Sequence, residues 1–253
     1  MLLVISPSKT QDFSHSSNQI FSKSRQISES EELVEILRNK SQNQIASLMS
    51  LSEKLSKLNY DRYKSFPTSL NLDNAKQAIL AFKGDVYSGI DASSMSQDEL
   101  EFAQDNLRMI SGLYGVLRPL DLIAPYRLEM STKLVNEMGN NLYQFWGDKI
   151  SRVINEDESE VIINLASNEY FKAIDKKSLN AEIINIIFKE NKGGEYKVIG
   201  IYAKRARGLM ARYMIDNKVL SPEGLKNFCL EGYRYRDNLS DNLNWTFTRD
   251  KVS

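Results

Sequence analysis

The sequence predicts an α/β protein of mixed α+β character that folds as a single compact domain. Short apolar runs typical of strands are spread between longer segments that have the spacing of amphipathic helices. The 253 residues are 42% hydrophobic, which is enough for one large core. Length alone would also allow two domains, but no repeat, low-complexity tract or linker divides the chain. We therefore expect one domain over residues 1–253.

In the first half of the chain, one strand is followed mainly by helices. Residues 2–5 are an apolar run that predicts a buried strand leading into an SPSK loop. The polar residues 14–30 predict a surface loop. Apolar residues at helical spacing over 31–58 predict one or two amphipathic helices. Two more helices are predicted, over 73–80 with an aspartate cap and from a capping box at 96–99 to about residue 108.

In the second half, strands and helices are predicted to alternate. We expect a helix over 142–154 and a β-branched strand over 161–166. Two strands that flank the pair Gly193-Gly194 are typical of a hairpin, at 182–189 and 196–202. The last predicted elements are a helix over 203–217 and aromatic strands at 233–236 and 245–249.

The composition narrows the possible functions. Lys and Arg together number 33, as do Asp and Glu, so any preference for nucleic acid, membranes or acidic ligands must come from local clusters. The single cysteine, Cys229, and the single histidine, His15, argue against disulfides, zinc clusters, iron–sulfur ligation and Ser-His-Asp chemistry. We therefore expect no metal site, no cofactor and a reducing, cytoplasmic location.

Nothing in the sequence indicates export or a membrane. The apolar run at the amino terminus is too short for a signal peptide, and no stretch approaches the roughly 18 apolar residues of a membrane span. We expect a soluble protein with no membrane partner, and a monomer.

The stretch SGLYGVLRPLDLIAPYRLEM, residues 111–130, has a first part that could bind an anion through its backbone. Glycines at this spacing would let the chain turn tightly and expose N–H groups. The residues of this candidate hairpin are Ser111, Gly112, Tyr114 and Gly115.

The second part of the same stretch would display charged side chains from a stiff loop, because two prolines remove backbone freedom. The charged residues are Arg118, Asp121, Arg127 and Glu129. A structural turn with ion-paired arginines is an equally good interpretation, since Arg–Asp pairs are common.

The segment AKRARGLMAR, residues 203–212, carries the strongest local excess of positive charge. Its cations are Lys204, Arg205, Arg207 and Arg212. At a strand-to-helix junction they would combine helix N–H groups with guanidinium groups, a combination that suits phosphate. The alternative is a solvated basic helix face.

Two predicted strands are each followed by polar residues, in SPSK at 6–9 and in NLASNEYF at 164–171. Open α/β sheets commonly bind ligands just beyond the carboxyl ends of their strands. A helix cap formed by Ser167 or Asn168 explains the second segment at least as well.

These segments, taken together, resemble the YaaA family of peroxide-stress proteins. The resemblance runs in order along nearly the whole chain, and the central motif is highly specific. Two departures are Ser8, where the family usually has alanine, and the unmatched residues 14–30 and 156–160. The matching segments are LLVISPSK at 2–9, FKGDVYSGIDA at 82–92, RMISGLYGVLRPLDLIAPYRLEM at 108–130, LYQFWGD at 142–148, INLASNEYF at 163–171, YKVIGIYAKRARGLMARYMI at 196–215 and WTFTR at 245–249.

The resemblance implies an α/β fold with a positively charged cleft and a helix-hairpin-helix element. It also implies binding to duplex or distorted DNA, protection against peroxide damage and an effect on available iron. We assign the hairpin to residues 111–115 from their glycine pattern, since the resemblance supports only the existence of such an element. The cleft residues that we expect are the cations Lys9, Arg118, Arg127, Lys204 and Arg207, oriented by Glu129 and Glu169.

Three hypotheses remain open. The first is a DNA-binding protective protein that contacts phosphates without strong sequence preference. The second is an enzyme acting on a small phosphorylated or nucleotide-like substrate, in which a desolvated lysine serves as base or nucleophile. Its candidate residues are Lys9, Glu129, Glu169, Tyr170 and Lys204. The third is an ion-paired core with no ligand.

Overall fold

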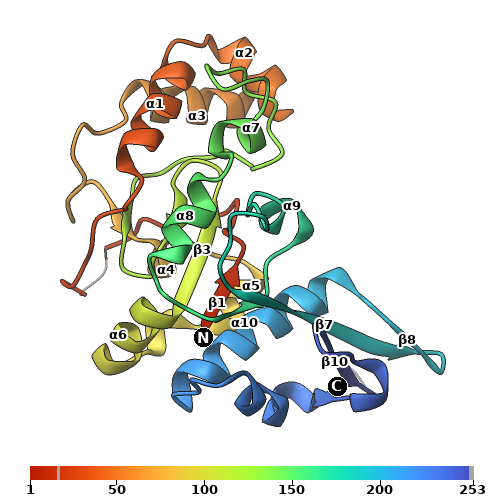
Figure 1. Ribbon diagram of the computed structural model, residues 1–253. Coiled ribbons are helices and arrows are strands. Elements are labelled where there is room, and N and C mark those ends of the chain that lie inside the picture. The colour runs from red at the N-terminus through yellow and green to blue at the C-terminus, as the bar shows by residue number, and fades with distance from the viewer. Residues whose placement is uncertain (16–17, 251–253) are drawn as a thin grey trace.

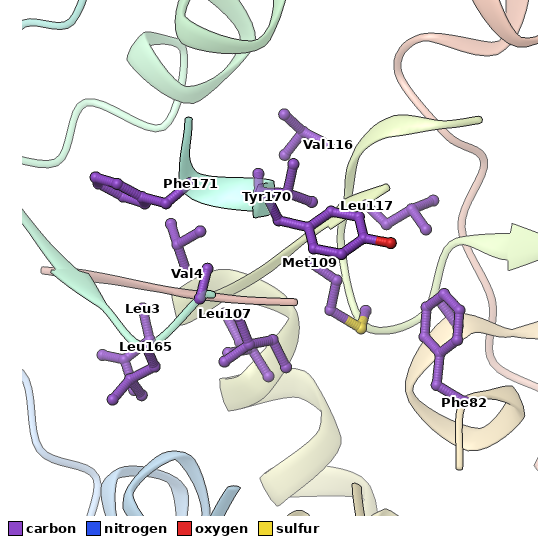
Figure 2. Packing of buried hydrophobic residues seen from close by; sticks show 14 of the residues in the cluster. Leu3, Val4, Phe82, Leu107, Met109, Val116, Leu117, Leu165, Tyr170 and Phe171 are labelled. Atoms are coloured by element: carbon purple, nitrogen blue, oxygen red, sulfur yellow. The ribbon is translucent and has the colours of Figure 1, made fainter. Parts of the chain in front are cut away.

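The computed structural model describes residues 1–15 and 18–250, and its centre is a mostly parallel sheet. Strand β1 (Leu2–Ile5) lies between β3 (Leu107–Ser111) and β6 (Val161–Asn164), parallel to both. All four residues of β1 are buried, as expected for a strand covered on both faces. Figure 2 shows Leu3, Leu107 and Leu165 together on one side of β1 and Val4 on the other. The predicted buried strand at 2–5 is therefore confirmed, and the strand predicted over 161–166 is present over 161–164.

The sheet continues on both sides of this centre in the order β4-β3-β1-β6-β7-β10-β9, with β8 paired to β7. Strands β6, β7 and β10 are parallel to one another, whereas β4, β8 and β9 pair antiparallel with their neighbours. A separate small pair joins β2 to β5. The bounds are β2 (Lys76–Gln77), β4 (Gly115–Leu117), β5 (Leu122–Ile123), β7 (Glu182–Lys192), β8 (Glu195–Lys197), β9 (Arg234–Tyr235) and β10 (Asn244–Arg249).

The order of the strands creates a switch point at β1. The chain passes from β1 to β3 on one side and then crosses to β6 on the other side. Connections that leave neighbouring parallel strands in opposite directions open a crevice at the carboxyl ends of those strands. The loops after β1 and β6 lie at this edge. The first contains SPSK, and NLASNEYF runs from the last residue of β6 through the second loop into α9.

Helices surround the sheet and form two groups (Figure 1). Helices α1, α2 and α3 gather at one end of the molecule, while α10 packs against β7 at the other. Capping boxes at Ser41 and Ser96 start α2 and α6, as predicted for Ser96. The bounds are α1 (Ile27–Arg38), α2 (Gln42–Met49), α3 (Glu53–Lys64), α4 (Ala78–Ala81), α5 (Asp85–Ile90), α6 (Gln97–Asn106), α7 (Leu142–Trp146), α8 (Lys149–Asn155), α9 (Asn168–Phe171) and α10 (Gly200–Asp216). Short 3-10 turns are η1 (Ala92–Ser94), η2 (Pro222–Asn227), η3 (Leu230–Gly232) and η4 (Asp237–Leu239).

Three predicted elements have different forms in the structure. The helix expected over 142–154 is split into α7 and α8, because Gly147 takes a positive φ of 48°. The helix expected over 73–80 is replaced by β2 and α4, and the Gln77 side chain donates to the carbonyls of Asn18 and Ile20. The second hairpin strand, expected over 196–202, ends at Lys197 because α10 already begins at Gly200.

Within the part of the chain that the structure describes, no helix has both the length and the apolar character needed to cross a bilayer. The predicted surface loop over 14–30 includes residues 16 and 17, which lie outside the described residues, and its last residues enter α1.

Candidate functional site

The loops that follow β1 and β6 are tied together at the carboxyl edge of the sheet. The backbone N–H of Ser167 donates to Ser6 Oγ at 2.8 Å, and that hydroxyl donates to Ser167 Oγ at 3.2 Å. The Tyr87 hydroxyl donates to the carbonyl of Ser6 at 2.9 Å. Three distant segments of the sequence therefore meet at one polar point.

A close crossing of α5 and α10 brings a fourth segment to this point. A Cβ on Gly208 would lie 1.9 Å from the carbonyl oxygen of Val86, and one on Gly89 would lie 2.6 Å from that of Arg205. Only glycine allows the two backbones to approach this closely. The crossing sets the basic residues of α10 beside the loop that precedes α5.

These four segments enclose a cavity of about 450 Å³, which is within the range of small-ligand sites. Four of the expected site residues line it, namely Lys9, Glu169, Lys204 and Arg207. The other lining residues are Ser6, Pro7, Ser8, Lys83, Gly84, Asp85, Val86, Tyr87, Ser167 and Tyr170. We call this space the cationic cavity, because four cations and two carboxylates line it.

Arg207 is the least compensated charge in the cationic cavity. Its side chain is half-buried, and burial lowers the pKa of its guanidinium from the ordinary value. Among residues 1–15 and 18–250 it finds no hydrogen-bond or ion-pair partner, whereas its neighbour Arg205 pairs with Glu231 at 2.6 Å. Since a buried charge without a partner costs free energy, the arrangement favours an anion beside Arg207.

The other three cations of this cavity are more exposed. Lys204 also has no ion pair within the described residues, and Lys83 lies 3.6 Å from a carboxylate oxygen of Asp12. Lys9 is 61% exposed and lies 3.0 Å from Glu129 Oε1. These lysines can reorient toward a ligand at little cost.

A second cavity of about 460 Å³ adjoins the first and shares Lys9 and Glu169 with it. Glu169 Oε1 accepts from both the backbone N–H and the hydroxyl of Ser131, at 3.1 Å and 2.8 Å. We call this space the mixed cavity, because hydroxyls, carboxylates and lysines line it together. Its lining residues are Lys9, Ser47, Leu48, Met49, Ser50, Glu129, Ser131, Thr132, Lys133 and Glu169.

Glu129 is held between two cations at the edge of the mixed cavity. Its Oε1 lies 3.0 Å from Lys9 Nζ and 3.1 Å from Arg127 Nη2. Burial alone would raise the pKa of Glu129, but the hydrogen bond from Lys9 and the charge of Arg127 outweigh it and lower that pKa. Glu129 is therefore ionised at neutral pH, and Arg127 acts through it rather than lining either of the two larger cavities.

Arg118 lies outside both cavities. Its guanidinium contacts the fully buried Asp121 at 2.9 Å and donates to the carbonyl of Lys23. Arg118 is therefore part of an ion-paired turn, as the structural interpretation predicted. It does not belong to the proposed site.

The candidate hairpin at 111–115 is a β-hairpin between β3 and β4, and it replaces the helix-hairpin-helix assigned to these residues. Ser111, Tyr114 and Gly115 are fully buried, and the N–H groups of Leu113 and Tyr114 donate to Ser111 Oγ. These amides are already satisfied and cannot face a phosphate.

The glycines of this hairpin serve close packing. A Cβ on Gly112 would lie 2.3 Å from the carbonyl of Leu128, and one on Gly115 would lie 2.3 Å from Gln26 Oε1. We therefore leave the hairpin out of the proposed binding surface.

Lys83 and Tyr87 also line the cationic cavity, although neither was predicted as a site residue. Both belong to the FKGDVYSGIDA segment, which supported the family resemblance but supplied no predicted site residue. The available signal was the pair of glycines, Gly89 in this segment and Gly208 in the basic one, since paired small residues permit a close helix crossing. Among residues 1–15 and 18–250, no three His, Cys, Asp or Glu side chains come together as metal ligands would.

Comparison with known proteins places the chain in a family. A family model described as peroxide stress protein YaaA matches residues 1–239. A UPF0246 protein of Hahella chejuensis is 49% identical over 255 residues, covering 99% of this chain and all of that protein. UPF0246 proteins of Shewanella baltica and Colwellia psychrerythraea are 50% and 51% identical over 256 and 254 residues, with 98% or more of each chain covered. The chain therefore belongs to the YaaA family of peroxide stress proteins.

Proposed function

We propose that this protein protects against peroxide by binding DNA through phosphates at the cationic cavity, without strong sequence preference, and that it thereby limits iron-dependent peroxide damage. The observation that carries the proposal is Arg207, a half-buried guanidinium with no partner in the described chain. A phosphate would supply the missing counter-charge through two parallel hydrogen bonds.

The charges around Arg207 support phosphate as its partner. Lys204 lies one helical turn before it and Lys83 lines the same cavity, so several cations could share one phosphate group or two successive ones. Phosphate contacts carry no sequence information by themselves. Because the chain as a whole has no net charge, the affinity for DNA should be modest and should come from the cationic cavity alone.

A second candidate is an enzyme acting on a small phosphorylated or nucleotide-like substrate. The observation that favours it is the location of the cationic cavity at the switch point of the sheet, where small ligands commonly bind. Lys9 or Lys204 would act as base or nucleophile. Burial raises the pKa of Tyr170, so this phenol would contribute hydrogen bonds in its neutral form.

The test is DNA affinity against salt concentration for the wild-type protein and for Arg207→Gln, by fluorescence anisotropy with duplex and bubble DNA. We expect Arg207→Gln to weaken binding and to reduce the salt slope by about one unit. The matched control is Arg205→Gln, on the same helix but paired to Glu231 outside the cavity. A flat salt response of the wild-type protein, or no binding at low salt, would contradict the proposal.

Lys204→Arg separates the two candidates. It keeps the charge but removes a titratable amine, so phosphate binding should largely survive. An enzyme that uses Lys204 as base or nucleophile should instead lose turnover while it still binds.

A further inference from the structure

The cationic cavity and the mixed cavity are two neighbouring compartments that share part of their wall. Lys9 and Glu169 line both of them. A third, much smaller pocket also has Lys9 in its wall, together with Glu129 and Tyr170 among others. A ligand that extends past Lys9 would contact both compartments.

The two compartments differ in their chemistry. Cations dominate the first, where Arg207 has no counter-charge within the described chain. The second is lined by hydroxyl groups and by two carboxylates, and its cations only balance those carboxylates. A ligand that matches both would carry an anion at one end and uncharged hydrogen-bond donors at the other.

The two carboxylates of the mixed cavity are held in the same way. Glu129 receives Lys9 and Arg127 on Oε1, and Glu169 receives both donors of Ser131 on Oε1. Within residues 1–15 and 18–250, Oε2 of each carboxylate accepts no hydrogen bond. Each side chain is therefore held through one oxygen, and the other oxygen is left without a donor among the described residues.

We infer that the two compartments form one bipartite site for a phosphate ester that carries neighbouring hydroxyl groups, as a ribose phosphate or a nucleotide does. The phosphate lies against Arg207, Lys204 and Lys83, as in the proposed function. This inference rests on that function. Two hydroxyls donate to the Oε2 atoms of Glu129 and Glu169. Carboxylates recognise the hydroxyls of ribose in this way because they accept two hydrogen bonds without donating any.

The first experiment compares ribose 5-phosphate with methyl phosphate, by isothermal titration calorimetry on the full chain. Both probes carry the phosphate monoester, but only the sugar carries hydroxyls. We expect ribose 5-phosphate to bind at least about tenfold more tightly, because each hydroxyl gains a charge-assisted hydrogen bond. Equal affinity for the two probes would overturn the bipartite site.

Variants identify the carboxylates. In Glu169→Gln, an N–H donor can replace the free acceptor, so the preference for the sugar should fall to about threefold or less. Methyl phosphate should bind no more weakly, since a negative charge has left the cavity wall. Glu129→Gln should act alike, and if it fails to fold, Glu169→Gln decides alone. Glu195→Gln, at an exposed position on β8, is the control. A preference retained in Glu169→Gln would overturn the assignment.

The failure of this inference is distinguishable from the failure of the proposed function. If the protein binds DNA and methyl phosphate, and Arg207→Gln lowers the affinity for both, the anion site is supported regardless of the affinity for ribose 5-phosphate. If neither binds, the anion site itself is wrong and the bipartite site with it.

A last arm identifies the source of the sugar phosphate. Two single RNA strands are compared, one ending in free 2′- and 3′-hydroxyls and one ending in a 3′-phosphate. Tighter binding of the free end assigns the mixed cavity to the ends of nucleic acid strands. Equal binding, together with a preference for ribose 5-phosphate, assigns it to free sugar phosphates or nucleotides.

Discussion

Arg207 is a residue whose charge is costly to the fold. Its charge is half-buried and has no partner within the described residues, and burial lowers the pKa of the guanidinium. A buried charge without a partner destabilises the folded state. An anion that binds beside it removes this free-energy cost.

We predict that Arg207→Gln leaves the free energy of unfolding unchanged or raises it by up to about 1 kcal/mol, while DNA binding weakens. Urea denaturation of the wild-type and variant proteins measures the first effect. Loss of more than about 1 kcal/mol would mean that Arg207 has a structural role instead.

The single histidine and the single cysteine lead to a second prediction at this scale. His15 and Cys229 are exposed, and neither lines the two cavities. The double variant His15→Gln, Cys229→Ser should therefore keep DNA affinity and peroxide survival. A folded double variant that no longer protects cells would show that the chemistry lies elsewhere than at the cations.

At the scale of elements, the geometry of the site depends on the crossing of α5 and α10. We predict that Gly208→Ala costs about 3 kcal/mol of stability, because the new Cβ would lie 1.9 Å from the Val86 carbonyl oxygen. It should also displace Lys204 and Arg207 and weaken phosphate binding. Urea denaturation and DNA anisotropy on the same samples provide both measurements.

The matched control is Gly200→Ala, at the first residue of the same helix. A Cβ there meets no atom within 4 Å, so the change should be neutral or should stabilise by about 0.5 kcal/mol. Equal effects at positions 200 and 208 would contradict the close-crossing explanation.

Elements were predictable from the sequence where local rules decide them. The strand at 2–5, the capping box at Ser96 and the turn at Gly193-Gly194 follow from short-range patterns. The secondary structure of residues 73–80 does not follow from short-range patterns, because β2 pairs with β5, which lies more than forty residues later in the sequence. Lys9 and Glu169 could be proposed because each follows a strand end, and Lys204 and Arg207 because they belong to the segment with the strongest excess of positive charge. Lys83 could not, because only the helix crossing brings it to them.

At the scale of the whole molecule, one carboxylate joins three segments that are far apart in the sequence. Asp157 lies 2.8 Å from Arg108 on β3 and 2.9 Å from Arg25 near the start of α1. Burial would raise the pKa of Asp157, but the hydrogen bonds and charges of the two arginines outweigh it and lower that pKa. The acidic loop at 156–160 was not part of the family resemblance, yet its Asp157 links these three segments.

We predict that Asp157→Asn lowers stability at neutral pH by about 3 kcal/mol, because the buried Arg108 loses its counter-charge and Arg25 keeps only Glu156, at 3.5 Å, among the described residues. A carboxylate with a lowered folded-state pKa stabilises the protein above its unfolded pKa, near 4, and this contribution is lost as the pH falls through the folded-state value. The wild-type protein should therefore approach the variant in stability below about pH 4. Urea denaturation from pH 7 to pH 3 measures this, and a constant difference across that range would contradict it.

The cationic cavity also has a place in the timing of synthesis. Its walls come from the loop after β1, the start of α5, the loop after β6 and the first turns of α10. A nascent chain on the ribosome therefore carries Lys9 and Lys83 long before Arg207 has been translated. The cavity is therefore complete only once the last of its four segments, α10, has been translated and has packed against α5.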